Sequence, residues 1–82
     1  MIAKLEEQFE KTKGRFANGS LIAIFAKFEV EKILDDVNYS LSMFKNLDNN
    51  DPMKQRFIAL KNQLTEFDEF LAGYLVQDEY TF

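Results

Sequence analysis

The chain has 82 residues, a formal net charge of −4, 46% hydrophobic and 29% charged residues, and neither histidine nor cysteine. This length allows one small domain, which buries only about 60% of the surface of its unfolded chain. Without histidine and cysteine, the sequence excludes catalytic triads built on histidine, thiol catalysis, and thiolate or imidazole metal sites. The balance of apolar and charged residues is typical of a folded domain rather than a disordered one.

Residues 2–13 are predicted to form a short helix, because their apolar side chains fall on one face at helical spacing. The next segment, residues 13–19, contains two glycines and an asparagine, which indicate a loop. Ser20 is suited to cap the N-terminus of the helix that follows.

Residues 21–47 are predicted to form a second, long helix. Its first half is apolar on nearly every side, and its second half fits a heptad frame: Val30, Ile33, Val37, Ser40, Phe44, Leu47. A strand over residues 21–30 is the alternative, but the chain offers no second strand with which it could pair.

The clearest pattern in the chain predicts a third helix over residues 52–76. Asp51 is a suitable N-cap, and Pro52 fits the first helical position, where its missing N–H costs nothing. Apolar residues then follow one another at alternating steps of four and three: Met53, Phe57, Leu60, Leu64, Phe67, Leu71, Tyr74. Such a seam is useful only to a helix that packs along its whole length against another helix.

Together these elements predict an all-α fold of three helices in a single domain, residues 1–82. Helices 21–47 and 52–76 form a long antiparallel hairpin, because a short polar turn joins them. We expect helix 2–13 to pack on the open end of the hairpin, where apolar residues are most abundant. Near the turn, four apolar residues are then left partly uncovered, and we expect a second copy of the chain or a partner to cover them: Leu34, Leu41, Met43, Ile58. Of these, Leu34, Leu41 and Ile58 are predicted to form the interface of a homodimer or higher homo-oligomer.

Charge is distributed unevenly along the chain. Residues 62–82 hold five of the fourteen acidic residues and none of the ten basic ones. This asymmetry predicts an acidic docking surface for a protein partner, which we expect to be basic. The candidate contact residues combine this face with the acidic tail 77–82: Glu66, Glu69, Asp78, Glu79, Tyr80, Phe82. The alternatives are a solvated acidic face and a frayed terminus. The absence of a basic cluster argues against direct binding of nucleic acid.

No cofactor or metal ion is predicted. Di-iron bundles require histidine, and the acidic turn at residues 48–51 lacks the glycine and glutamate of a calcium-binding loop. The one candidate for a small ligand is an anion site in the first loop, where Lys13 and Arg15 stand close to the start of the second helix.

The leading hypothesis is a non-enzymatic protein–protein interaction module that acts by stoichiometric binding, such as a small phage- or plasmid-encoded modulator of a host protein. The alternatives are a co-chaperone or adaptor that holds a helical subunit, and an oligomeric binder of a small anionic ligand. No apolar run approaches the roughly 20 residues that span a bilayer, so we expect a cytoplasmic location, or the host cytoplasm for a viral protein.

The plan of a short N-terminal helix followed by a long hairpin resembles small co-chaperones of type III secretion needles. It also resembles small helical phage-encoded inhibitors of host proteins. The shared residues are Leu5-Glu6 and the Asp51-Pro52 turn. Any helical hairpin would use such residues, so the resemblance transfers no functional residue to this chain.

Overall fold

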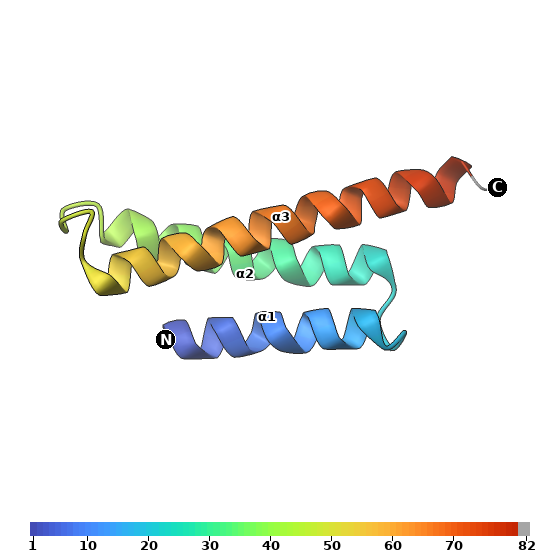
Figure 1. Ribbon diagram of the computed structural model, residues 1–82, viewed down its shortest axis with the longest axis horizontal. Coiled ribbons are helices and arrows are strands. Elements are labelled where there is room, and N and C mark those ends of the chain that lie inside the picture. The colour runs from blue at the N-terminus through green and yellow to red at the C-terminus, as the bar shows by residue number, and fades with distance from the viewer. Residues whose placement is uncertain (81–82) are drawn as a thin grey trace.

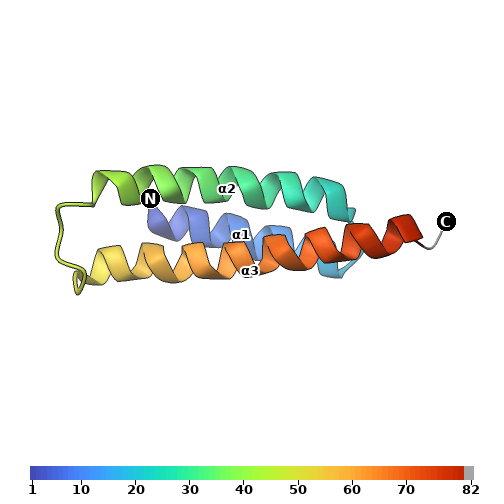
Figure 2. The same ribbon diagram turned by 90° about the horizontal axis from the view of Figure 1, so that it is seen from above.

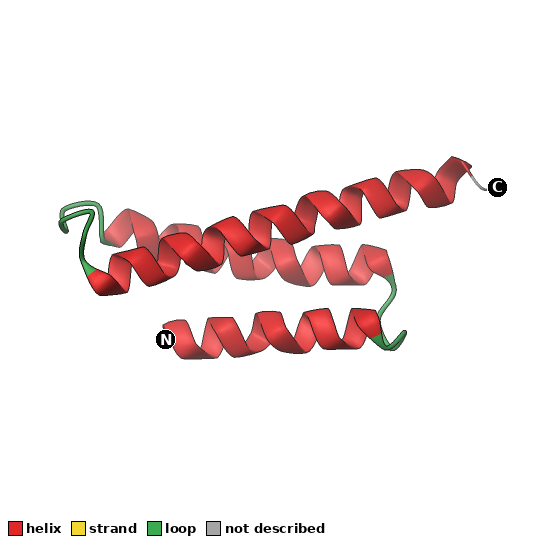
Figure 3. Cartoon of the chain, viewed as in Figure 1, coloured by secondary structure: helices red, strands yellow, loops and turns green. Residues whose placement is uncertain are grey.

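The computed structural model describes the backbone of residues 1–80 and the side chains of residues 1–76. Within residues 1–80 it contains three helices and no strand: α1 (Ile2–Ala17), α2 (Ala23–Met43) and α3 (Pro52–Tyr80) (Figure 3). The predicted all-α fold is therefore confirmed. Residues 23–30, where a strand was the alternative, are helical.

The helices form an elongated bundle of 49 × 21 × 16 Å. α2 and α3 make the long antiparallel hairpin, and α1 lies along its open end, more closely on α2 than on α3 (Figure 1). Figures 1 and 2 both show that the N-terminus stops short of the α2–α3 turn. They also show that α3 extends beyond the α1–α2 loop. The predicted arrangement is thus confirmed, with the α2–α3 turn at one end and α3 alone at the other projecting past α1 (Figures 1 and 2).

One buried stripe from each helix builds the core. On α3, four residues of the predicted seam are at most 3% exposed: Phe57, Leu60, Leu64, Leu71. The α2 stripe continues the predicted frame and includes small residues near its start: Ala23, Ala26, Val30, Ile33, Val37. The α1 stripe is Ile2, Leu5 and Phe9. Full burial of a leucine-sized side chain contributes roughly 2 kcal/mol, so these stripes dominate the stability of so short a chain.

α1 ends in a Schellman motif. Gly19, with φ at +83°, adopts the left-handed conformation that favours glycine. The N–H of Gly19 donates to the Phe16 carbonyl at 3.2 Å, and the N–H of Ser20 donates to the Arg15 carbonyl at 2.9 Å. The helix therefore ends at Ala17 rather than at residue 13, and the predicted loop is wrong over its first part.

Packing explains why the helix continues through Gly14. A glycine inside a helix costs only about 1 kcal/mol. The extra turn carries Phe16 onto the ring of Phe67, with ring centroids 6.0 Å apart. That contact, together with the cap at Gly19, outweighs the penalty at Gly14.

The predicted cap at Ser20 is also wrong. Ile22, in an extended conformation with φ −75° and ψ 158°, occupies the N-cap position of α2 without a side-chain hydrogen bond. Leu21 explains the difference, because an extended loop lets its side chain reach the core, where it is 7% exposed. α2 accordingly begins at Ala23.

At its other end α2 stops at Met43, short of the predicted residue 47. Phe44 leaves the helix, and its ring meets that of Phe57 edge to face, with centroids 5.3 Å apart. The turn then leads to α3, whose predicted cap is confirmed. Asp51 Oδ1 accepts hydrogen bonds from the N–H groups of Met53 at 3.0 Å and Lys54 at 3.1 Å.

Candidate protein-binding surfaces

A row of aromatic rings joins the end of α1 to the C-terminal half of α3. Phe16 meets three rings of α3 edge to face, at centroid distances of 6.0 Å to Phe67, 6.3 Å to Phe70 and 5.6 Å to Tyr74. Phe9 continues the row into the core, 5.8 Å from Phe67. Phe70 and Tyr74 remain 53% and 43% exposed, so the outer part of the row is open to a partner.

A groove of about 330 Å³ runs beside this row, between α1 and α3. Its lining combines apolar, acidic and basic side chains: Phe9, Lys13, Gln63, Glu66, Phe67, Phe70. Lys13 Nζ lies 4.4 Å from the centroid of the Phe9 ring and 2.7 Å from the Glu10 carboxylate. The ammonium group of Lys13 thus makes a cation–π contact with the Phe9 ring, an arrangement that stabilises positive charge.

Two of the predicted partner-binding residues, Glu66 and Glu69, are exposed on α3. Among residues 1–76, neither takes part in an ion pair. Glu66 lies one helical turn before Phe70 and shares its groove. We call the combined patch the acidic–aromatic surface: Phe16, Glu66, Glu69, Phe70, Tyr74. Four other predicted residues have side chains outside the described residues: Asp78, Glu79, Tyr80, Phe82.

Asp68 is also acidic, but its carboxylate forms an ion pair with a lysine of α2. Lys27 Nζ lies 2.7 Å from Glu31 Oε1 and 2.9 Å from Asp68 Oδ1, which ties α2 to α3. The hydrogen bonds that Lys27 donates to Glu31 and, next, to Asp68 raise the pKa of Lys27 above its ordinary value. Asp68 is therefore a bridge between helices, and the open negative charge of the described part of α3 comes from Glu66 and Glu69.

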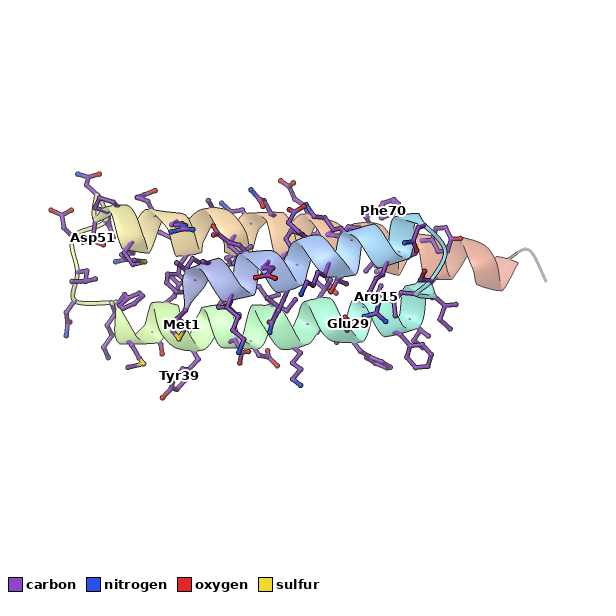
Figure 4. All side chains as sticks on the ribbon, turned by 90° about the horizontal axis from the view of Figure 1, so that it is seen from below. Met1, Arg15, Glu29, Tyr39, Asp51 and Phe70 are labelled. Atoms are coloured by element: carbon purple, nitrogen blue, oxygen red, sulfur yellow. The ribbon has the colours of Figure 1, made fainter. Side chains whose placement is uncertain are left out.

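The two residues of the predicted anion site do not converge. Arg15 faces a polar groove of about 320 Å³ between α1 and α2, where it lies 3.3 Å from the Glu29 carboxylate. Glu29 also accepts a hydrogen bond from the buried Thr12 hydroxyl at 3.0 Å. Lys13 lines the other groove, between α1 and α3. Figure 4 shows Arg15 and Glu29 between α1 and α2, with Phe70 at the opposite edge of α1.

The predicted oligomer residues are half-buried: Leu34, Leu41 and Ile58. Leu34 and Leu41 pack against the hydrophobic core. Three large apolar side chains are exposed at the open end, which α1 was expected to cover. Ile24, Phe25 and Phe28 are 43%, 55% and 57% exposed, so that part of the prediction is wrong.

A signal for this exposure exists in the sequence. Continuing the α2 heptad frame towards its start places Ala23 and Ala26 in the core, and both are at most 6% exposed. Phe25 and Phe28 then fall on the opposite side of the helix. The apolar composition of this segment conceals its orientation, because large and small apolar residues are interspersed along it.

Within the described residues, no group of three or more histidine, cysteine, aspartate or glutamate side chains is placed to hold a metal ion. In the same part of the chain, no helix combines the length and apolar character that crossing a bilayer requires. Comparisons with known protein families, with curated proteins and with solved structures find no match to this chain.

Proposed function

We propose that this chain is a non-enzymatic protein-binding module that holds a basic segment of a partner protein on the acidic–aromatic surface. The observation that carries the proposal is the coincidence, on one surface, of open aromatic rings and carboxylates that form no ion pair within residues 1–76. Phe70 is 53% exposed, and Glu66 stands one turn away in the same groove.

The chemistry of this surface favours a basic partner. Aromatic faces attract ammonium and guanidinium groups, and large aromatic residues are the commonest anchors at protein interfaces. The position of Lys13 over the Phe9 ring illustrates the same contact within the chain. Carboxylates at the rim of such a patch accelerate the approach of a basic partner and set its orientation.

The partner can be sought with the full chain as bait in an extract of its source cells. Glu66→Lys with Glu69→Lys should abolish recovery of the specific partner, and Phe70→Ala should do the same. Raising the salt concentration should weaken its capture, because the contacts are exposed charges. Glu7→Lys is the matched control, since Glu7 is an exposed acid of α1 whose one ion pair among the described side chains is with Lys11.

Loss of the partner from the Glu7→Lys variant, or its retention by the Glu66→Lys/Glu69→Lys variant, would contradict the proposal. Loss caused only by Leu41→Asp, in a variant that circular dichroism shows to be folded, would favour the co-chaperone alternative. In that case the apolar side of the hairpin would be the binding surface.

A further inference from the structure

The outer face of α2, opposite its buried stripe, carries most of the large exposed apolar side chains of that helix. We define this face by seven residues: Ile24, Phe25, Phe28, Lys32, Asp35, Tyr39, Met43. Phe28, Tyr39 and Met43 are 57%, 68% and 64% exposed. Figure 4 shows Tyr39 pointing away from α1 and α3. No described residue of the chain covers this face.

The order of residues along this face is symmetric. Six of them follow at steps of four, four, three, four and four: Ile24, Phe28, Lys32, Asp35, Tyr39, Met43. Read from either end, the face gives an aliphatic side chain, an aromatic ring and a charge, and the two central charges are opposite. Contacts between two identical copies require such self-complementarity, because each residue of a pair occurs on both copies.

We propose that two copies of this chain associate through the outer faces of α2, packed antiparallel about a two-fold axis between Lys32 and Asp35. In this register Phe28 meets Tyr39 of the second copy, and Ile24 meets Met43 of the second copy. The face is about 28 Å long, at about 1.5 Å per residue. The product is a homodimer of two three-helix units, with α1 and α3 of each copy on the flanks.

Charge selects the antiparallel arrangement over the parallel one. Lys32 and Asp35 are exposed, and neither forms an ion pair within residues 1–76. Antiparallel packing places Lys32 opposite Asp35 of the second copy, twice about the axis. Parallel packing would set lysine against lysine and aspartate against aspartate, which is destabilising.

A hollow beside α2 provides a place for Phe25, which lies at the α1 edge of the face. The hollow has a volume of about 540 Å³ and is lined by Met1, Leu5, Tyr39 and Met43, among others. In the antiparallel register, Phe25 of the second copy comes beside Met43 on the same edge. The exposed ring of Phe25 in each copy thus lies at the hollow of the other copy, and this contact occurs twice in the dimer.

The mass of the full chain in solution gives the first test. Sedimentation equilibrium over a series of concentrations should show association towards twice the 9.6 kDa of one chain. A mass of one chain at every concentration would overturn the proposal.

Charge exchange tests the pairing at the axis. Lys32→Glu alone and Asp35→Lys alone should each weaken association about tenfold, because each creates two like-charge pairs. The double variant Lys32→Glu/Asp35→Lys should restore the affinity of the original chain. Lys61→Glu, an exposed charge on α3, should leave it unchanged. Failure of the double variant to recover would overturn the antiparallel register.

Oxidative cross-linking tests the register directly, because the chain contains no cysteine of its own. The double variant Phe28→Cys/Tyr39→Cys should form disulfide-linked dimers, since each new thiol faces the other position on the second copy. Phe28→Cys alone should stay monomeric on a denaturing gel. Efficient cross-linking of that single variant would indicate parallel packing and overturn the proposal.

Discussion

Lys27 and Asp68, 41 residues apart in the sequence, form an ion pair of 2.9 Å that joins the first half of α2 to the second half of α3. The same ammonium group also binds Glu31, so two carboxylates share one lysine. Lys27 therefore adds a polar contact to the apolar packing of α2 on α3, and this contact favours one register of the two helices.

Removing this lysine should lower stability in a pH-dependent way. We expect Lys27→Met to reduce the free energy of unfolding by about 0.5–1 kcal/mol, a modest effect because water screens a partly exposed pair. The pKa of Lys27 is raised above 10.5 in the folded chain. Its stabilising contribution is therefore complete below that pH and is lost as the pH rises through the folded-state pKa.

Urea denaturation at neutral pH and at about pH 11 to 12 would measure this effect. The original chain should lose more stability over that interval than the Lys27→Met variant, which controls for tyrosines and other lysines. Equal losses in the two proteins would show that the ion pair contributes nothing to folding.

The seam of α3 makes a sharper prediction about the core. Leu64 is fully buried, whereas Ile58 is only half-buried on the flank of the helix. Leu64→Ala should cost about 3 kcal/mol, and Ile58→Ala less than about 1.5 kcal/mol. Chemical denaturation of both variants provides the measurement. Similar losses would mean that Ile58 is covered in solution, as a homo-oligomer through Leu34, Leu41 and Ile58 would require.

The cap of α3 can be tested with a closely matched pair of variants. Asp51→Ala should reduce the free energy of unfolding by about 1 kcal/mol, because two N–H groups lose their acceptor. Asp51→Asn retains an acceptor oxygen and should change stability by only a few tenths of a kcal/mol. If both variants lost the same amount, the carboxylate charge rather than the cap geometry would be responsible.

Periodicity predicted the helices and the core well, because burial along a helix repeats with the turn of the helix. The alternating spacing predicts the inner face of α3, and its middle members Phe57, Leu60 and Leu64 are buried. The two ends of the seam, Met53 and Tyr74, are 45% and 43% exposed, so the helix does not pack along its whole predicted length. Helix ends were predicted less well, because contacts between distant residues decide them. Phe44 leaves α2 to meet Phe57, and no local pattern announces that contact.

The candidate sites show the same division. The distribution of charge along the sequence indicates an acidic C-terminal region. Only the fold shows that Asp68 forms an ion pair with Lys27. It also shows that packing α1 against α3 places Phe9 and Lys13 in one groove with Glu66 and Phe70. Pairing of charges and rings across helices cannot be obtained from composition.

The two glycines of the first predicted loop provide the last prediction, because the structure assigns them opposite roles. Gly14 lies inside α1 with open space where a Cβ would stand, so Gly14→Ala should raise stability by about 0.5–1 kcal/mol. Gly19 has φ at +83°, so Gly19→Ala should lower stability by about 1 kcal/mol. Thermal unfolding of the two variants beside the original chain distinguishes the roles. If both substitutions lowered the melting temperature, α1 would end near residue 13, and the contacts of Phe16 with α3 would not form in solution.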